Sequence, residues 1–131
     1  MGTTDQATSV VHGYDAFRAG NFAALVELIA DDCVWHITGR NPLAGMYRGR
    51  DAIVGLMART VELSGGTIEV DVVDITMSDN HIVVLQRTRA TRAGKTLDNR
   101  TAIVMAVRDG LLVEAWDYFE NQYQRDEFWS D

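Results

Sequence analysis

The strongest constraint on the fold lies in the second half of the chain, where four stretches are rich in Val, Ile and Thr, the residues that favour strands. These stretches are residues 68–77, 82–91, 96–107 and 111–119. The breaks between them are short and contain turn-forming residues, such as Asp109 followed by Gly110. Parallel strands would need a crossover on the order of a dozen residues, which these breaks do not provide. The sequence therefore predicts consecutive antiparallel hairpins.

The first half of the chain has helical spacing instead. In residues 10–29 apolar side chains recur at steps of three and four, and Gly20 followed by Asn21 supplies a C-cap and an N-cap that divide the pattern into two helices. A strand, a loop with Gly and Pro, and a third helix are predicted at residues 33–38, 39–49 and 51–63, respectively. Helices followed by a strand meander predict an α+β fold with the helices on one face of the sheet.

The predicted strands have apolar residues on both faces, as in residues 82–85 and 102–107. Strands of this kind are covered on both sides. The helices would cover one face, and we expect a second subunit to cover the other in a homodimer. The alternative is a monomer with a well-filled core.

Composition narrows the classes of function. With 131 residues and 47% hydrophobic content, the chain is expected to form one soluble domain over residues 1–131. A net charge of −7 disfavours nucleic acid and anionic membrane surfaces as partners, and no window is apolar enough to span a membrane. The single cysteine, Cys33, excludes an internal disulfide and favours a reducing cytoplasm. Three scattered histidines and the absence of a phosphate-binding or dinucleotide motif predict no metal and no cofactor.

Trp35 and His36 are adjacent within the predicted strand at residues 33–38. Neighbouring side chains of a strand point to opposite faces, so both can be core residues only if both faces are covered. At least one of them is expected to line something other than a packed core. His36 is the histidine that falls inside a strand, and it either lines a pocket or bonds to nearby backbone.

Three phrases of the sequence resemble the nuclear transport factor 2-like superfamily, and within it the SnoaL-like and ketosteroid-isomerase-like branch. They are AFRAGNFAALVELIADDCVWHI, GMYRGRDAIVGL and RDGLLVEAWDYFENQYQRDEFW, in this order within residues 8–129. The resemblance implies a cone-shaped half-barrel, in which a strongly bent antiparallel sheet packs against three N-terminal helices around a mostly apolar pocket. The superfamily includes isomerases, cyclases, dehydratases, epoxide hydrolases and noncatalytic binding proteins, so the reaction stays open.

The last predicted strand provides acids on both faces. Strand alternation places on one face Glu114, Trp116 and Glu120, and on the other face Asp117 and Phe119. Resemblance to SnoaL-like cyclases, which have an acid a few residues beyond the tryptophan of this strand, favours Glu120 in the pocket. Asp117 is the competing candidate, and a solvated strand edge is the alternative for each acid.

Two patterns of the superfamily are not matched. Alignment with ketosteroid isomerase places Gly13 and Ile37 where that enzyme has its oxyanion tyrosine and its base, so steroid isomerisation by those groups is not expected. The charged set of the epoxide hydrolases could be suggested by Arg87, Arg89, Asp98 and Arg100. Their parities favour a cross-strand charge ladder on one face instead.

Together these features predict a cofactor-independent enzyme that uses acid/base isomerisation, cyclisation or dehydration on a small, hydrophobic, oxygenated molecule. The catalytic candidates are His36, Glu120 and Asp117. The candidates for substrate binding are Tyr14, Trp35, Tyr47, Asn99, Thr101, Ile103, Met105, Trp116 and Phe119. The alternatives are a noncatalytic binding protein for a small apolar ligand and a dimeric protein-interaction module.

Overall fold

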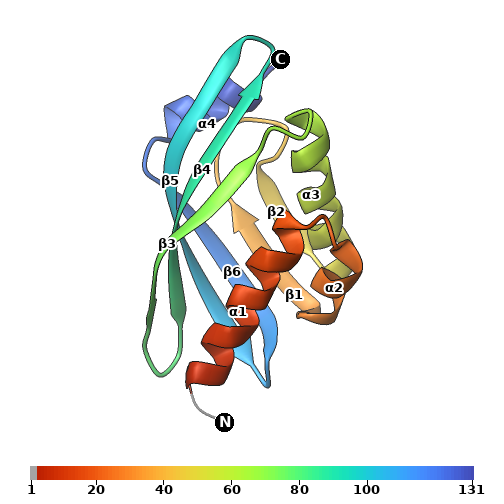
Figure 1. Ribbon diagram of the computed structural model, residues 1–131, viewed down its shortest axis with the longest axis vertical. Coiled ribbons are helices and arrows are strands. Elements are labelled where there is room, and N and C mark those ends of the chain that lie inside the picture. The colour runs from red at the N-terminus through yellow and green to blue at the C-terminus, as the bar shows by residue number, and fades with distance from the viewer. Residues whose placement is uncertain (1–2) are drawn as a thin grey trace.

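The computed structural model describes residues 3–131, which form one curved sheet and its helices (Figure 1). The strands are β1 (Ile29–Ile37), β2 (Gly45–Arg48), β3 (Glu69–Met77), β4 (Ile82–Arg92), β5 (Lys95–Arg108) and β6 (Leu111–Phe119). They lie in the order β2-β1-β6-β5-β4-β3, and the edge strands β2 and β3 do not pair with each other. All neighbours are antiparallel except β1 and β6. The predicted hairpins and the α+β class with a bent, unclosed sheet are confirmed.

Tight turns set the register of the last two hairpins. Ala93 and Gly94 between β4 and β5, and Asp109 and Gly110 between β5 and β6, all have positive φ angles, from 50° to 79°. A two-residue turn with positive φ at both positions matches the right-handed twist of the strands that it joins. The register in turn determines which side chains of β4, β5 and β6 share a face.

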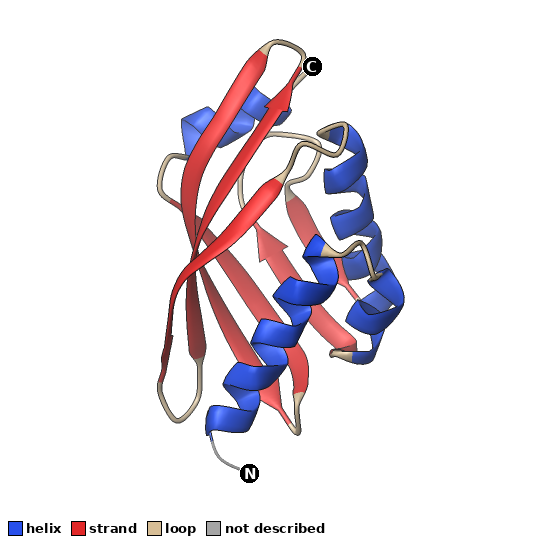
Figure 2. Cartoon of the chain, in the orientation of Figure 1, coloured by secondary structure: helices blue, strands red, loops and turns tan. Residues whose placement is uncertain are grey.

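Three helices, α1 (Thr3–Arg18), α2 (Phe22–Glu27) and α3 (Arg50–Leu63), lie on one face of the sheet (Figure 2). The corner between α1 and α2 forms as predicted. Gly20 has a φ of 69°, and the Asn21 side chain accepts a hydrogen bond of 3.2 Å from the backbone N–H of Ala24. None of the helices in the described residues combines the length and the apolar character that crossing a membrane requires.

Three local features differ from the sequence prediction. β1 begins at Ile29 rather than at residue 33, because its first residues pair with β6, where the Leu112 N–H donates to the carbonyl of Leu28 at 2.9 Å. The predicted loop at residues 39–49 contains β2, which pairs with β1. A fourth helix, α4 (Gln122–Trp129), follows β6 and packs on β5.

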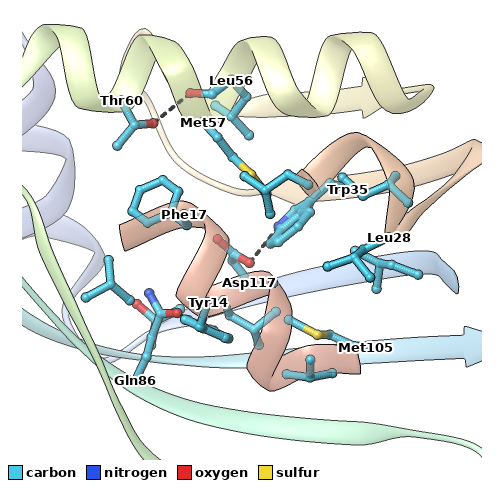
Figure 3. A pocket seen from close by; sticks show the side chains of 18 of the residues that line it. Tyr14, Phe17, Leu28, Trp35, Leu56, Met57, Thr60, Gln86, Met105 and Asp117 are labelled. Carbon is cyan, nitrogen blue, oxygen red and sulfur yellow. Dashed lines mark hydrogen bonds between the residues drawn. The ribbon is translucent and has the colours of Figure 1, made fainter. Parts of the chain in front are cut away.

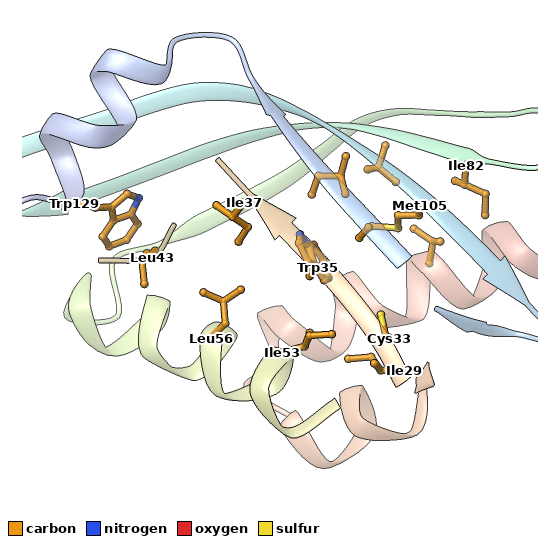
Figure 4. Packing of buried hydrophobic residues seen from close by; sticks show 14 of the residues in the cluster. Ile29, Cys33, Trp35, Ile37, Leu43, Ile53, Leu56, Ile82, Met105 and Trp129 are labelled. Atoms are coloured by element: carbon orange, nitrogen blue, oxygen red, sulfur yellow. The ribbon is translucent and has the colours of Figure 1, made fainter. Parts of the chain in front are cut away.

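The core lies between α3 and the helix-covered face of the sheet (Figure 4). Ile53 of α3 and Cys33 of β1 are both fully buried there. Burial raises the pKa of the Cys33 thiol to about 11, which disfavours the reactive thiolate form. Trp129 of α4 and Leu43 of the loop before β2 extend this core toward the other end of α3.

Candidate functional site

A cavity of about 170 Å³ lies between α1, α2 and α3 and the inner, helix-covered face of the sheet (Figure 3). A buried water needs about 10–15 Å³ by the same measure, so the cavity has room for a small organic molecule. α1 contributes Val10, Gly13, Tyr14 and Phe17, whose spacing places them along one helical face. Most of the other lining residues are apolar, as expected of a small-molecule site.

Strand alternation places Trp35 in the cavity wall. On β1 the side chains of Cys33, Trp35 and Ile37 are buried on the inner face. The indole Nε1–H of Trp35 donates a hydrogen bond of 2.7 Å to Oδ1 of Asp117 on β6 (Figure 3). β1 and β6 are neighbours in the sheet, so this bond crosses directly from one strand to the next.

Asp117 is the acid that borders the cavity. Its side chain is buried, and burial raises its pKa from the usual 3.8 to about 6, although the positive charge of Arg125 and the bond from Trp35 act in the opposite direction. Within the described residues no hydrogen bond engages its second oxygen, Oδ2. A carboxyl group in this state exchanges its proton near neutral pH and has an oxygen available to a ligand.

Tyr14 forms a second polar element of the wall. Its hydroxyl donates a hydrogen bond to Oε1 of Gln86 on β4, and Nε2 of Gln86 donates to Oγ1 of Thr88 at 2.9 Å. Burial, and then the negative charge of Asp117, raise the pKa of Tyr14 far above its usual value. The tyrosine is therefore a neutral hydroxyl at every physiological pH.

Seven of the predicted site residues line the cavity. They are Tyr14, Trp35, Thr101, Ile103, Met105, Asp117 and Phe119. Two others pack elsewhere on the inner side. The Tyr47 hydroxyl donates to the carbonyl of Leu43 at 2.8 Å, and the Asn99 amide donates to the carbonyl of Asn121 at 3.0 Å beside α4.

His36, Trp116 and Glu120 lie outside the cavity. His36 follows Trp35 and therefore points to the outer face, where its Nε2 is 2.7 Å from Oε2 of Glu114. Its ring stacks on Trp116, with the ring centres 5.6 Å apart and the planes at 7°. Glu120 comes after the end of β6 and is exposed to solvent. Between the two acids weighed from the sequence, the one at the cavity is Asp117.

The predicted charge ladder forms on the outer face of the sheet. Arg87 makes two hydrogen bonds to Asp98, of 2.8 and 2.6 Å, and Arg89 pairs with Asp71 at 2.9 Å. The first pair joins β4 to β5 and the second joins β4 to β3, and both arginine side chains are partly exposed to solvent. This set is separate from the cavity and does not form the charged arrangement of an epoxide hydrolase there.

Several polar residues of the cavity were not predicted from the sequence, among them Gln86 and Arg125. Gln86 and Thr88 are two residues apart in β4 and therefore point to the same face of the strand. Both faces of this strand contain apolar residues, so the sequence did not show that this face is the inner one. Arg125 lies on α4, a helix with few apolar positions that the spacing did not predict. No local signal in the sequence indicates that this arginine is buried.

Comparison with known proteins gives consistent results. A sequence model of the SnoaL-like domain matches residues 10–115. The uncharacterized protein Rv0034 of Mycobacterium tuberculosis is 31% identical over 118 residues, which are 89% of this chain and 90% of that protein. The structure of Bal32a, from a soil-derived mobile gene cassette, is 33% identical, covers 96% of this chain and 97% of that chain, and has a TM-score of 0.93.

A more distant likeness supports the fold alone. The structure of IdmH, a putative polyketide cyclase from Streptomyces antibioticus, is 23% identical, covers 88% of this chain and 92% of that chain, and has a TM-score of 0.74. Nuclear transport factor 2-like and ketosteroid-isomerase-like folds are also among the similar structures. The resemblance found in the sequence is confirmed, and the chain belongs to the SnoaL-like domain family.

Proposed function

We propose that the protein is a cofactor-independent enzyme that moves a proton on a small, hydrophobic, oxygenated molecule bound in the cavity. The supporting observation is Asp117, a buried carboxyl group whose pKa is raised to about 6 at the wall of an apolar cavity. A general acid or base works best when its pKa lies near the operating pH. His36 and Glu120 are weaker candidates because neither borders the cavity.

The proposed step begins with ionised Asp117 beside a carbon next to a carbonyl group. The C–H bond breaks, the proton goes to Oδ2 of Asp117, and the electron pair of the bond moves into an enolate. Returning the proton to a different carbon gives isomerisation. In cyclisation the enolate carbon forms a bond to the carbon of a second carbonyl group, and the new alkoxide takes the proton from Asp117. In dehydration the C–O bond to a β-hydroxyl group breaks, and the leaving hydroxide takes this proton and departs as water.

Two structural neighbours suggest which molecules to test first. IdmH is described as a putative polyketide cyclase, and TerC, which is 17% identical, was co-crystallized with polyporic acid. Both likenesses support the fold alone, so they guide the choice of ligands and do not identify the substrate. Polycyclic ketones and phenols are the first classes to test.

A noncatalytic binding protein is the second candidate. The observation that favours it is the bond from the Tyr14 hydroxyl to Gln86, which engages a neutral donor of the cavity wall. An enolate needs a donor for its oxygen. If Tyr14 keeps its present partner, the cavity would hold a ligand without reacting with it.

We expect the protein to catalyse hydrogen–deuterium exchange at the carbons next to the carbonyl group of ketones such as 1-tetralone and 2-acetylnaphthalene. Because Asp117 accepts a proton only when ionised, the rate should rise with pH and level off above about pH 6. Proton NMR in deuterated buffer measures the loss of signal. A rate that falls as the pH rises would instead make Asp117 the proton donor.

Ligand binding is measured separately by quenching of tryptophan fluorescence. Quenching should be largely lost in Trp35→Phe, because Trp35 lines the cavity, and should persist in Trp116→Phe, because Trp116 lies on the outer face. Saturable binding without exchange at any pH would support the noncatalytic binding protein.

We also propose that the protein is a homodimer formed by the outer face of the sheet. Four residues are register neighbours across four strands: His36, Trp116, Val104 and Val83. Exposed Met46 and Tyr118 flank this row. Aromatic residues and methionine are enriched in protein interfaces.

Light scattering should therefore give twice the chain mass of 14.6 kDa. Val104→Glu should give a monomer, because it places a charge in the centre of the proposed interface. The matched control is Val11→Glu on α1, an exposed position away from this face, which should leave the mass unchanged. A monomeric wild-type protein would contradict the proposal.

A further inference from the structure

Arg125 is a buried cation at the wall of the cavity. It lies on α4, and its residue is only 9% exposed. Its guanidinium carbon is 4.1 Å from the centre of the Phe119 ring, which also lines the cavity. Asn121 caps the N-terminus of α4, and its side chain accepts a hydrogen bond of 3.0 Å from the backbone N–H of Gln124. The cap and the ring together fix where the guanidinium lies.

The guanidinium lacks the partners that a buried arginine normally has. Among the described residues no carboxylate oxygen lies within 4.0 Å of it, and its buried Nε has no hydrogen-bond partner. A guanidinium has five N–H donors, and burying a charge without pairing it is costly. The charges of Asp117 and of the adjacent Asp126 offset only part of the effect of burial, which lowers the pKa of Arg125. Asp126 forms no ion pair with it and accepts bonds from Asn41 and from the backbone N–H of Arg40.

Among the described residues, two charged side chains border the cavity. Asp117 and Arg125 are the ionisable acid and base among its lining residues, and all other charged side chains of the described chain lie elsewhere. The positive charge of Arg125 lowers the pKa of Asp117, but burial has the larger effect. The two groups therefore influence each other without forming an ion pair.

We propose that Arg125 binds an ionised oxygen of the ligand, so that the cavity takes an amphiphilic molecule with an apolar ring system and one delocalised oxyanion. The inference rests on the proposed function in that it places the ligand in the same cavity. A planar guanidinium matches a carboxylate, an acidic enolate or a phenolate, because each presents delocalised negative charge to its N–H groups. The apolar lining holds the ring system, and the oxyanion supplies the partner that Arg125 lacks.

The test compares two probes that differ in charge and hardly in shape, 2-naphthoate and 2-naphthamide. Isothermal titration calorimetry at pH 7.5 should show that the wild-type protein binds the carboxylate more tightly than the amide by about tenfold or more, the usual strength of a charge-assisted bond. Equal affinities would overturn the inference, and this comparison needs no variant.

Variants then assign the preference to Arg125. Arg125→Met should bring the two affinities within about threefold of each other, and Arg125→Lys should retain part of the difference, because lysine keeps the charge but not the fork of donors. The control is Arg100→Met, which removes an exposed cation on the outer face and should leave the preference unchanged. A preference that survives Arg125→Met would overturn the inference.

The inference and the proposed function can fail separately. Asp117→Asn should still prefer 2-naphthoate, because Arg125 remains. A wild-type protein that prefers the carboxylate but catalyses no exchange would refute the proposed enzyme and support the ligand class. A protein that catalyses exchange without preferring the carboxylate would refute the ligand class alone.

Discussion

Asp117→Asn should lower the rate of ketone hydrogen exchange by about 10²–10⁴-fold, the usual contribution of general acid–base catalysis. Asparagine has nearly the same shape and can still accept the bond from Trp35 at its side-chain oxygen, but it cannot take up a proton. Ligand affinity measured by fluorescence should change by no more than about threefold. Glu120→Gln should exchange at the wild-type rate, because Glu120 is exposed.

Measuring the stability of Asp117→Asn shows whether a lower exchange rate comes from unfolding. The folded-state pKa of Asp117 is raised to about 6, above the usual 3.8, so ionising this group in the folded protein costs free energy. That cost is absent below about pH 4, grows as the pH rises, and is complete above about pH 6. Asp117→Asn should therefore be more stable than wild type at pH 7.5, by up to about 3 kcal/mol, and lose this advantage in acid.

Two outcomes would contradict the role of Asp117. The first is a variant that exchanges at the wild-type rate, which would place the proton transfer on another group. The second is equal loss in Asp117→Asn and Glu120→Gln, which would point to net charge rather than to a positioned base. Urea unfolding at several pH values and NMR exchange on the same preparations separate these results from unfolding.

The largest loss of stability is expected from Trp129→Ala. This side chain is fully buried, and its ring packs edge-on against Phe128 with the ring centres 4.7 Å apart. Among the described residues its indole N–H has no hydrogen-bond partner, so the substitution removes packing and no hydrogen bond. Removing a buried tryptophan lowers the free energy of unfolding by about 3–5 kcal/mol. Urea unfolding measures the change.

Tyr123→Ala on the same helix is the matched control. Tyr123 is 90% exposed, so its removal should change the free energy of unfolding by no more than about 0.5 kcal/mol. If Trp129→Ala had as small an effect, α4 would not be anchored to the core. The position of Arg125 would then be in doubt as well.

Much of the fold could be predicted because its determinants are local. The turn at Asp109 and Gly110 needs residues that tolerate positive φ, and the spacing in residues 51–63 marks one apolar helical face. Helix α4 was missed because its buried residues, such as Phe128, lie near its end and contact strands far away in sequence. Strand β2 was missed because its few residues form a strand only by pairing with β1.

The candidate site was predictable in part. Strand alternation grouped Thr101, Ile103 and Met105 on one face, and these three side chains line the cavity together. For the acid, strand alternation left Asp117 and Glu120 open, and the resemblance favoured Glu120, which lies outside the cavity. Alternation could not decide between them, because apolar residues occupy both faces of the neighbouring strands and either face could have been the inner one.

The sequence by itself determined the three N-terminal helices, the strands other than β2, their turns and the alternation that separates Trp35 from His36. Only the tertiary structure decided which side of that alternation is enclosed, and it did so by packing the three N-terminal helices on one face. The bond from Trp35 to Asp117 joins residues 82 positions apart. The raised pKa of Asp117 and the unpaired charge of Arg125 have the same origin, because both depend on exclusion of water by elements from the whole chain.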